Sequence, residues 1–481
     1  MNPPPFGWLN SSLLITYLIG MLIIGWLFSR RPQTPDQFFL GGRTLPWLAV
    51  AMSMYASLTS AVTYIGLPAT AYEENIALIA VSLASLAVAP VILKCFYPFY
   101  HRHRVTTSYQ FIQQRFGTGA QRSVALLFIL SRLGWLGTVI YAPALALSTA
   151  TGFSLTTCIL LMGTVATLYT TLGGLAAVVW TDVLQFLILV GGALWIAVSL
   201  TLSIDGGAPA ILQQAHATGR LDIFDWPPSL FHLSLPIVAI SFFLQLMQEY
   251  GTDQVTVQRM MATGSQQKTL KAILFNAATD LFIISTLLYI GLGLFSFYQI
   301  HPLPPDIQPD RLMPHYIIHQ LPNGINGLLI TAIFAAAMSS MDSGINALAT
   351  VLLNDFKKPG PHVVRHARLL TILLGILATA IAFYVATLGG LIKAFAAFMG
   401  LFSAPILALF LLGVLTQRTR FTDWLIGLSL SIPLTLWAQH GIRVHWVWYF
   451  PLSFTAAFLT TWLAGYRHKK KPSLEDSLPA T

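Results

Sequence analysis

The sequence predicts an all-helical protein that crosses a membrane many times. Of its 481 residues, 55% are hydrophobic and only 9% are charged. Apolar stretches of about twenty residues recur along the chain, and each is long enough to cross a hydrocarbon core of about 30 Å as a helix. We therefore expect about 13 transmembrane helices in an all-α polytopic membrane protein.

Hydrophobicity alone places these helices. The predicted crossings are 8–29, 44–70, 76–98, 123–149, 155–171, 175–203, 232–257, 270–298, 323–353, 366–387, 391–414, 422–438 and 446–465. The first crossing follows MNPPP and is followed at once by Arg30 and Arg31, which reverses the charge order of a signal peptide. We expect the N-terminus outside, the C-terminus in the cytoplasm, and the protein in the plasma (inner) membrane.

The distribution of basic residues supports this topology independently. About twenty of the 26 Lys and Arg residues fall on the cytoplasmic side, as the positive-inside rule requires. The exceptions are Arg220, Arg311 and Arg443 outside, and Lys94, Arg132 and Lys393 within helices. Because the net charge of +9 follows from topology, it does not indicate a nucleic-acid partner.

One membrane helix, within residues 332–356, is unusually polar. It places Ser339, Ser340, Asp342, Ser343 and Asn346 close together, where hydrocarbon would penalise each of them. Clustered hydroxyl and carboxylate oxygens suit a hard cation such as sodium. The alternative is that the serines only allow close helix packing, but an acid inside the membrane favours a functional role.

Two crossings carry polar interruptions at similar depth. Residues 53–63 contain five hydroxyl side chains before GLP at 66–68, and residues 248–254 read QEYGTDQ. An intact helix with hydroxyls bonded to its own carbonyls is the alternative for the first. Interrupted helices at matching positions of two halves are typical of inverted-repeat transporters, whose binding site lies at the midplane between them.

The predicted organisation follows from pairing these two interruptions. Residues 1–43 form a leading helix and a cytoplasmic loop, 44–203 the first five-helix repeat, and 204–231 an external loop. Residues 232–414 form the second five-helix repeat, 415–465 two additional helices, and 466–481 a cytoplasmic tail. The core therefore has one extra helix before it and two after it.

Nearly the whole chain resembles the sodium/solute symporter family, which includes bacterial galactose, proline and sialic acid carriers. The resemblance rests on five segments: GGRTLPW at 41–47, SLTSAVTYIGLPATAY at 57–72, GGLAAVVWTDVLQ at 173–185, TDQVTVQR at 252–259 and AAAMSSMDSGINALAT at 335–350. It implies a LeuT-type core of five plus five inverted helices. It also implies a sodium site between the first and eighth core helices.

The resemblance assigns ligands to that sodium site. Backbone carbonyls would come from Ala56, Thr59 and Ala336, and hydroxyls from Ser339 and Ser340. The residues agree with this assignment, because the first two lie where the helix should unwind and the others share one face of a helix.

Members similar to the sialic acid carriers hold a second sodium nearer the cytoplasm. Here it would involve Asp182 of WTD, Ser339, Asp342 and Ser343, and Asp342 stands where a serine is expected. A second carboxylate could strengthen cation binding or accept a proton. Asp182 could alternatively serve as an anion at the start of its helix.

Arg132 lies about ten residues into its crossing, too deep to reach either interface easily. Guanidinium geometry fits a clamp on a substrate carboxylate, and the alternative is a buried ion pair with Asp182 or Glu249. The resemblance to sialic acid carriers implies that Ser60 and Thr63 complete the carboxylate pocket. The remaining substrate-binding residues predicted at the second interruption are Glu249, Tyr250 and Asp253.

These observations predict a sodium-coupled symporter that imports a small polar solute by alternating access. An acidic sugar such as a sialic acid, or another carboxylate, is favoured; a neutral sugar, an amino acid or a vitamin is the alternative. A membrane enzyme or sensor is the competing class, but no pair of acids or histidines at one membrane face supports it. We expect sodium as the coupling ion, no other cofactor, no obligate protein partner and, without a phosphate loop, no ATP drive.

Overall fold

The computed structural model describes residues 6–29, 37, 40–98, 100, 106–171, 175–304, 307–356 and 363–468. Its first part contains α1 (Trp8–Ser29), η1 (Gly41–Arg43), α3 (Trp47–Leu58), α4 (Ala61–Glu73), η2 (Ala77–Ile79), α5 (Ala80–Val91), η3 (Ile92–Phe96), α7 (Gln110–Phe116), α8 (Thr118–Thr151), α9 (Leu155–Thr170) and α10 (Leu175–Leu202). The next part contains α11 (Gly207–Ala217), α12 (Leu235–Gly251), α13 (Gln254–Ala262), α14 (Gln266–Ile300), η4 (Pro309–Arg311), α15 (Leu312–Gln320), α16 (Ile325–Val351) and η5 (Leu352–Phe356). The last part contains α17 (Val363–Val385), α18 (Leu391–Phe398), η6 (Met399–Ser403), α19 (Ala404–Leu415), α20 (Phe421–Trp437), η7 (Ala438–Ile442), η8 (Trp446–Trp448) and α21 (Tyr449–Gly465).

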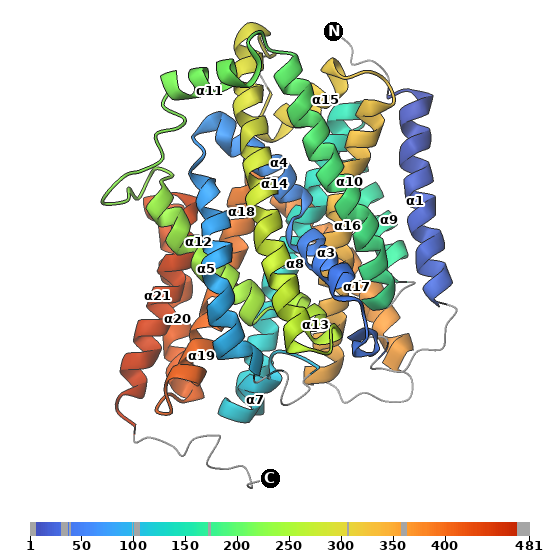
Figure 1. The fold of residues 1–481 in the computed structure, drawn as a ribbon. Coiled ribbons are helices and arrows are strands. Elements are labelled where there is room, and N and C mark those ends of the chain that lie inside the picture. The colour runs from blue at the N-terminus through green and yellow to red at the C-terminus, as the bar shows by residue number, and fades with distance from the viewer. Residues whose placement is uncertain are drawn as a thin grey trace.

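The described chain is helical throughout, and its long helices run side by side as one bundle (Figure 1). Within it, nine helices are long and apolar enough to cross a membrane, and the bent pair α3 and α4 makes a tenth. Two shorter apolar helices, Trp8–Ile24 and Leu155–Leu168, fall within predicted crossings. The all-helical membrane architecture is therefore confirmed, while the number of about 13 crossings stays a prediction.

The polar helix α16 occupies the centre of the bundle. It contacts α3, α8 and α10, and 94% of its most apolar window is buried. Burial by other helices on all sides explains how this helix tolerates its serines and its acid, because none of them has to face lipid. By contrast, α1 stands at one edge and α20 and α21 at the other (Figure 1).

The first predicted interruption is a true break. α3 ends at Leu58 and α4 begins at Ala61, and the two helices meet at an angle of 57°. Thr59 and Ser60 leave helical geometry, with ψ of 88° and 174°. The Ser60 hydroxyl accepts a hydrogen bond from the Val62 amide at 3.1 Å, so this side chain caps the new helix.

The second predicted interruption is also a break. α12 ends at Gly251 and α13 begins at Gln254, and the carboxylate of Asp253 caps α13 by accepting from the Val255 amide at 2.9 Å. A helix that restarts needs a cap for its first amides, and Ser60 and Asp253 supply one at each break. The pairing of residues 44–203 with 232–414 as inverted repeats stays a prediction.

Candidate functional site

The break between α3 and α4 exposes carbonyl oxygens next to α16. Because α3 ends at Leu58, the carbonyls of its last turn lose their helical partners. The Ser340 hydroxyl on α16 donates to one of them, the carbonyl of Ser57, at 3.0 Å. The five residues predicted for the first sodium site, Ala56, Thr59, Ala336, Ser339 and Ser340, therefore lie on two segments that contact each other. Their role as ligands stays a prediction.

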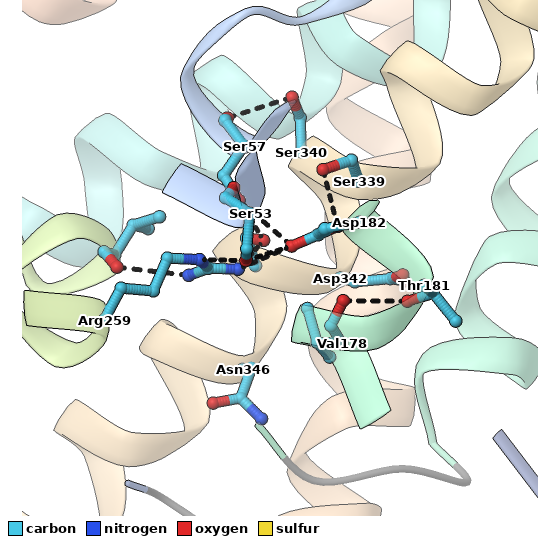
Figure 2. Close-up of polar contacts among 12 residues, drawn as sticks. Ser53, Ser57, Val178, Thr181, Asp182, Arg259, Ser339, Ser340, Asp342 and Asn346 are labelled. Atoms are coloured by element: carbon cyan, nitrogen blue, oxygen red, sulfur yellow. Dashed lines mark hydrogen bonds and ion pairs between the residues drawn. The ribbon is translucent and has the colours of Figure 1, made fainter. Parts of the chain in front are cut away.

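Asp182 on α10 is the centre of a buried polar cluster beside this break. Its Oδ1 accepts from Ser339 at 2.6 Å, and its Oδ2 accepts from Ser53 at 2.5 Å. Asp182, Ser53 and Ser339 are fully buried. Figure 2 shows the carboxylate of Asp182 between the serines of α3 and α16.

Arg259 on α13 supplies the positive charge of this cluster (Figure 2). Its Nη2 lies 3.2 Å from Asp182 Oδ2, and its Nε donates to Ser53 at 2.8 Å. It also donates to the carbonyl of Val255 at 3.1 Å and to the hydroxyl of Ser343. The guanidinium therefore neutralises Asp182 and occupies the hydroxyl of Ser343, one of the residues predicted for the second sodium site.

Arg259 lies inside the helix bundle, contrary to the predicted topology. The seventh crossing is predicted to end at residue 257, which places Arg259 on the cytoplasmic side, whereas α13 continues to Ala262 and buries Arg259 completely. A signal was available, because an acid at Asp182 deep in a membrane helix requires a partner of opposite charge.

Asp342, the fourth residue predicted for the second sodium site, also contacts α9. Its Oδ1 accepts from Thr170 on α9 at 2.5 Å. Ser343 lies on the side of Asp182, where its hydroxyl is 2.7 Å from that of Ser57. The structure thus brings Asp182, Ser339 and Ser343 together around Arg259, and Thr170 of α9 holds Asp342.

Arg132 on α8 is also held by an acid. Its Nε donates to Asp253 Oδ2 at 2.9 Å, and its Nη2 pairs with the same oxygen. The partner is therefore Asp253, rather than Asp182 or Glu249 as the ion-pair alternative supposed. Arg132 also lies over the ring of Trp135 at 4.5 Å. A guanidinium carries five N–H donors, so donors remain for a ligand after this pairing.

A central cavity of about 120 Å³ opens between the two breaks. It is lined by most of the residues predicted to bind substrate: Ser60, Thr63, Arg132, Glu249 and Tyr250. Asp253, the sixth predicted residue, does not line it but orients Arg132. Arg132, Ser60 and Thr63 therefore line one cavity, and their role in binding substrate stays a prediction.

Much of the remaining wall is apolar. Leu58, Val62, Leu78, Trp135, Phe242 and Ile284 are among its lining residues. Asp280 also lines the cavity, and its Oδ2 accepts a hydrogen bond from Ser85 at 2.7 Å. The cavity therefore combines an ionic and hydroxyl-rich side with an apolar side, a pattern typical of sites for small organic ligands.

Comparison with known proteins identifies what kind of protein carries this site. The Sodium:solute symporter family model matches residues 38–428. The chain is 30% identical to the sodium/sialic acid symporter SiaT of Proteus mirabilis, covering 92% of each chain. It is 32% identical to the human sodium-coupled monocarboxylate transporter 2, covering 86% of this chain and 69% of that one.

Two solved structures of transporters resemble this one. The structure of a Na⁺-coupled sialic acid symporter superposes with a TM-score of 0.89 at 28% identity, covering 97% of this chain and 99% of that one. Mhp1, a nucleobase-cation-symport-1 family transporter, shares the fold at a TM-score of 0.56 and 14% identity, covering 92% of this chain and 98% of that one. All these proteins are transporters, in agreement with the expectation that the chain is not an enzyme. The chain belongs to the Sodium:solute symporter family.

Proposed function

We propose that this protein imports a small organic carboxylate and that inward sodium movement drives the import. The observation that carries the proposal is the position of Arg132, a buried guanidinium that lines the central cavity together with the hydroxyls of Ser60 and Thr63. Asp253 balances the charge of Arg132. The remaining N–H donors of Arg132 are available to a substrate carboxylate.

Sodium would bind at the α3–α4 break, next to the cavity. The proposed ligands are the carbonyls of Ala56, Thr59 and Ala336 and the hydroxyls of Ser339 and Ser340. Support comes from the contact between Ser340 and the Ser57 carbonyl, which brings the two ligand-bearing segments within bonding distance of each other. Thr59 carries the ion site and also lines the cavity, so sodium and solute would stabilise the same conformation of the break.

Transport would proceed by alternating access. In the proposed arrangement, residues 44–203 and 232–414 are inverted repeats within about 13 crossings, and the two breaks lie at the interface between them. Residues 1–43 and 415–465 would add one helix before this core and two after it. The N-terminus would lie outside the plasma (inner) membrane, and the tail 466–481 would lie in the cytoplasm.

The relatives suggest two kinds of carboxylate. An acidic sugar is the substrate class expected from the sequence, and the names of the bacterial relatives support it. A small monocarboxylate is the second candidate, because the cavity measures only about 120 Å³ and has apolar residues such as Leu58, Val62 and Leu78 beside its ionic side. A sugar needs hydrogen-bond partners for its hydroxyls, and an apolar wall leaves them unpaired.

Binding of matched ligands tests the carboxylate. The purified protein is titrated with sialic acid and pyruvate and with a neutral analogue of each, in sodium buffer. We expect the parent to prefer the acids and Arg132→Ala to lose about 2 to 5 kcal/mol of that binding, some thirtyfold or more in affinity. Arg132→Lys keeps the charge but loses the planar fork, so it should also weaken binding of the acids substantially. Equal losses for acid and neutral analogue would assign Arg132 only to its ion pair with Asp253.

A further inference from the structure

A second cavity, of about 410 Å³, lies at the end of the bundle where α4 ends. Four of its lining residues are basic or titratable to a cation: Lys393, His440, Arg443 and His445. Its position follows from His445, whose Nε2 lies 3.2 Å from Glu74 Oε1, just after the last residue of α4. In the proposed topology this end faces the outside of the cell. We call this cavity the outer basic pocket.

The charge of the outer basic pocket is not balanced by its own walls. No carboxylate belongs to its described lining, and Glu74 at its edge is engaged with His445. Within the described chain, neither Lys393 nor Arg443 forms an ion pair. Lys393 and Arg443 are exposed, so their charges act on ions that approach from solution.

The backbone holds Arg443 at the wall of this pocket in an uncommon conformation. Its φ is 59° and its ψ is 46°, in the left-handed region that non-glycine residues seldom adopt. Two hydrogen bonds hold the two residues that follow it: the Val444 amide donates to the carbonyl of Ala438, and the His445 amide donates to the carbonyl of Leu230 at 2.8 Å. The backbone that carries the Arg443 side chain is therefore held in place.

The outer basic pocket adjoins the central cavity. Trp446 lines both, so the two cavities meet at this residue. Ile392 lines the central cavity and its neighbour Lys393 lines the outer pocket. An anion held at Lys393 and Arg443 would therefore lie next to the cavity that contains Arg132.

We propose that the outer basic pocket is a second, weaker binding site for the carboxylate group of the solute, where the solute is captured before it passes Trp446 to the central cavity. This inference rests on the proposed import of carboxylates. Positive groups at the entrance of a site raise the rate of encounter with anions and make it sensitive to salt. An anionic lipid headgroup shares this chemistry and must be separated from the solute by experiment.

Uptake kinetics provide the first test. Parent, Lys393→Gln, Arg443→Gln and the double variant are compared in proteoliposomes made of phosphatidylcholine alone, with pyruvate and sialic acid as solutes. We expect the double variant to raise KM for the transported acid about 3- to 10-fold with little change in maximal rate, and to weaken the salt dependence of KM. Arg443→Lys keeps the charge and should keep KM. Lys268→Gln removes an exposed charge from the start of α14 and is the matched control.

Two results of the kinetics would overturn the proposal: an unchanged KM in the double variant, or an equal rise in KM in Lys268→Gln. An effect that appears only when phosphatidylglycerol is added would assign the pocket to a lipid headgroup instead.

If the parent shows no sodium-driven uptake of either acid, the proposed function fails. Pyruvate binding in sodium-free buffer, measured by saturation-transfer NMR on the parent and the double variant, then decides this inference alone: binding lost in the double variant supports it, and equal binding overturns it.

Discussion

The Asp182–Arg259 ion pair gives a specific prediction about the stability of the protein. Replacing Arg259 with methionine fills this fully buried position with an unbranched apolar side chain and removes the guanidinium. Asp182 then loses its cationic partner and keeps hydrogen bonds from Ser53 and Ser339. Breaking a buried ion pair by removing one partner costs about 3 to 5 kcal/mol of folding stability. We expect a loss near the lower value, because the two serine hydroxyls still donate hydrogen bonds to the carboxylate.

Sodium should reverse part of this loss. In Arg259→Met, the carboxylate of Asp182 and the released hydroxyls of Ser53 and Ser343 become available to a cation. A ligand present at 100 times its dissociation constant stabilises the folded state by about 2.7 kcal/mol. The assay is thermal unfolding in nanodiscs, in sodium chloride and in choline chloride at equal ionic strength. We expect the variant to gain more from sodium than the parent does.

Removing both charges provides the control. Arg259→Met combined with Asp182→Asn leaves no uncompensated charge, so the double variant should be more stable in choline than the sum of the single losses predicts. The reasoning would be refuted if Arg259→Met unfolds at the parent's temperature in choline, because the pair would then contribute no stability. It would also be refuted if sodium stabilised the parent and the variant equally.

Three further predictions concern single groups. Ser340→Ala removes one proposed sodium ligand and the hydrogen bond to the Ser57 carbonyl. We expect the variant to fold normally and to lose at least tenfold in sodium affinity, or about 1.4 kcal/mol, as measured by the sodium dependence of uptake. An unchanged sodium dependence would contradict the first sodium site. Asp342→Asn keeps an oxygen for Thr170, so we expect the Hill coefficient for sodium to stay at the parent's value, and a fall toward one would instead place a second sodium at Asp342. His315 lies outside the membrane-spanning helices, and burial lowers its pKa from about 6.5 to about 4. The neutral imidazole therefore contributes fully to the free energy of unfolding above pH 6.5, and this contribution is lost as the pH falls toward 4. His315→Gln should reduce the loss of stability between pH 7 and pH 4 by about 1 kcal/mol, measured as a smaller drop in melting temperature, and an unchanged drop would exclude His315 as the cause of that loss.

The sequence was sufficient to locate both helix breaks. Hydroxyls at Ser57, Ser60 and Thr63 and the polar run ending in Asp253 are too costly for uninterrupted membrane helices, so their positions carry the information directly. Of the residues around the central cavity, Glu249 and Tyr250 were predicted from the second break, Arg132 from its depth in its own helix, and Ser60 and Thr63 from the resemblance to sialic acid carriers.

The partners of the charged residues could not be predicted in the same way. Arg132 could have paired with any of several acids, and Asp253 is its partner because Asp253 also caps α13 and so lies at a fixed place at the break. Arg259 was missed because hydropathy ended its helix too early, since α13 has polar residues that are buried by protein rather than by lipid. Such side-chain pairings depend on three-dimensional packing, which a hydropathy profile does not contain.

Uptake of a labelled carboxylate into proteoliposomes under an imposed sodium gradient tests the central claim most directly. Pyruvate and sialic acid serve as the two solutes, and an equal potassium gradient serves as the control. Sodium-coupled symport predicts transient accumulation of at least one acid above its external concentration, and its abolition by a sodium ionophore. Uptake of the same size in sodium-free buffer would contradict the account.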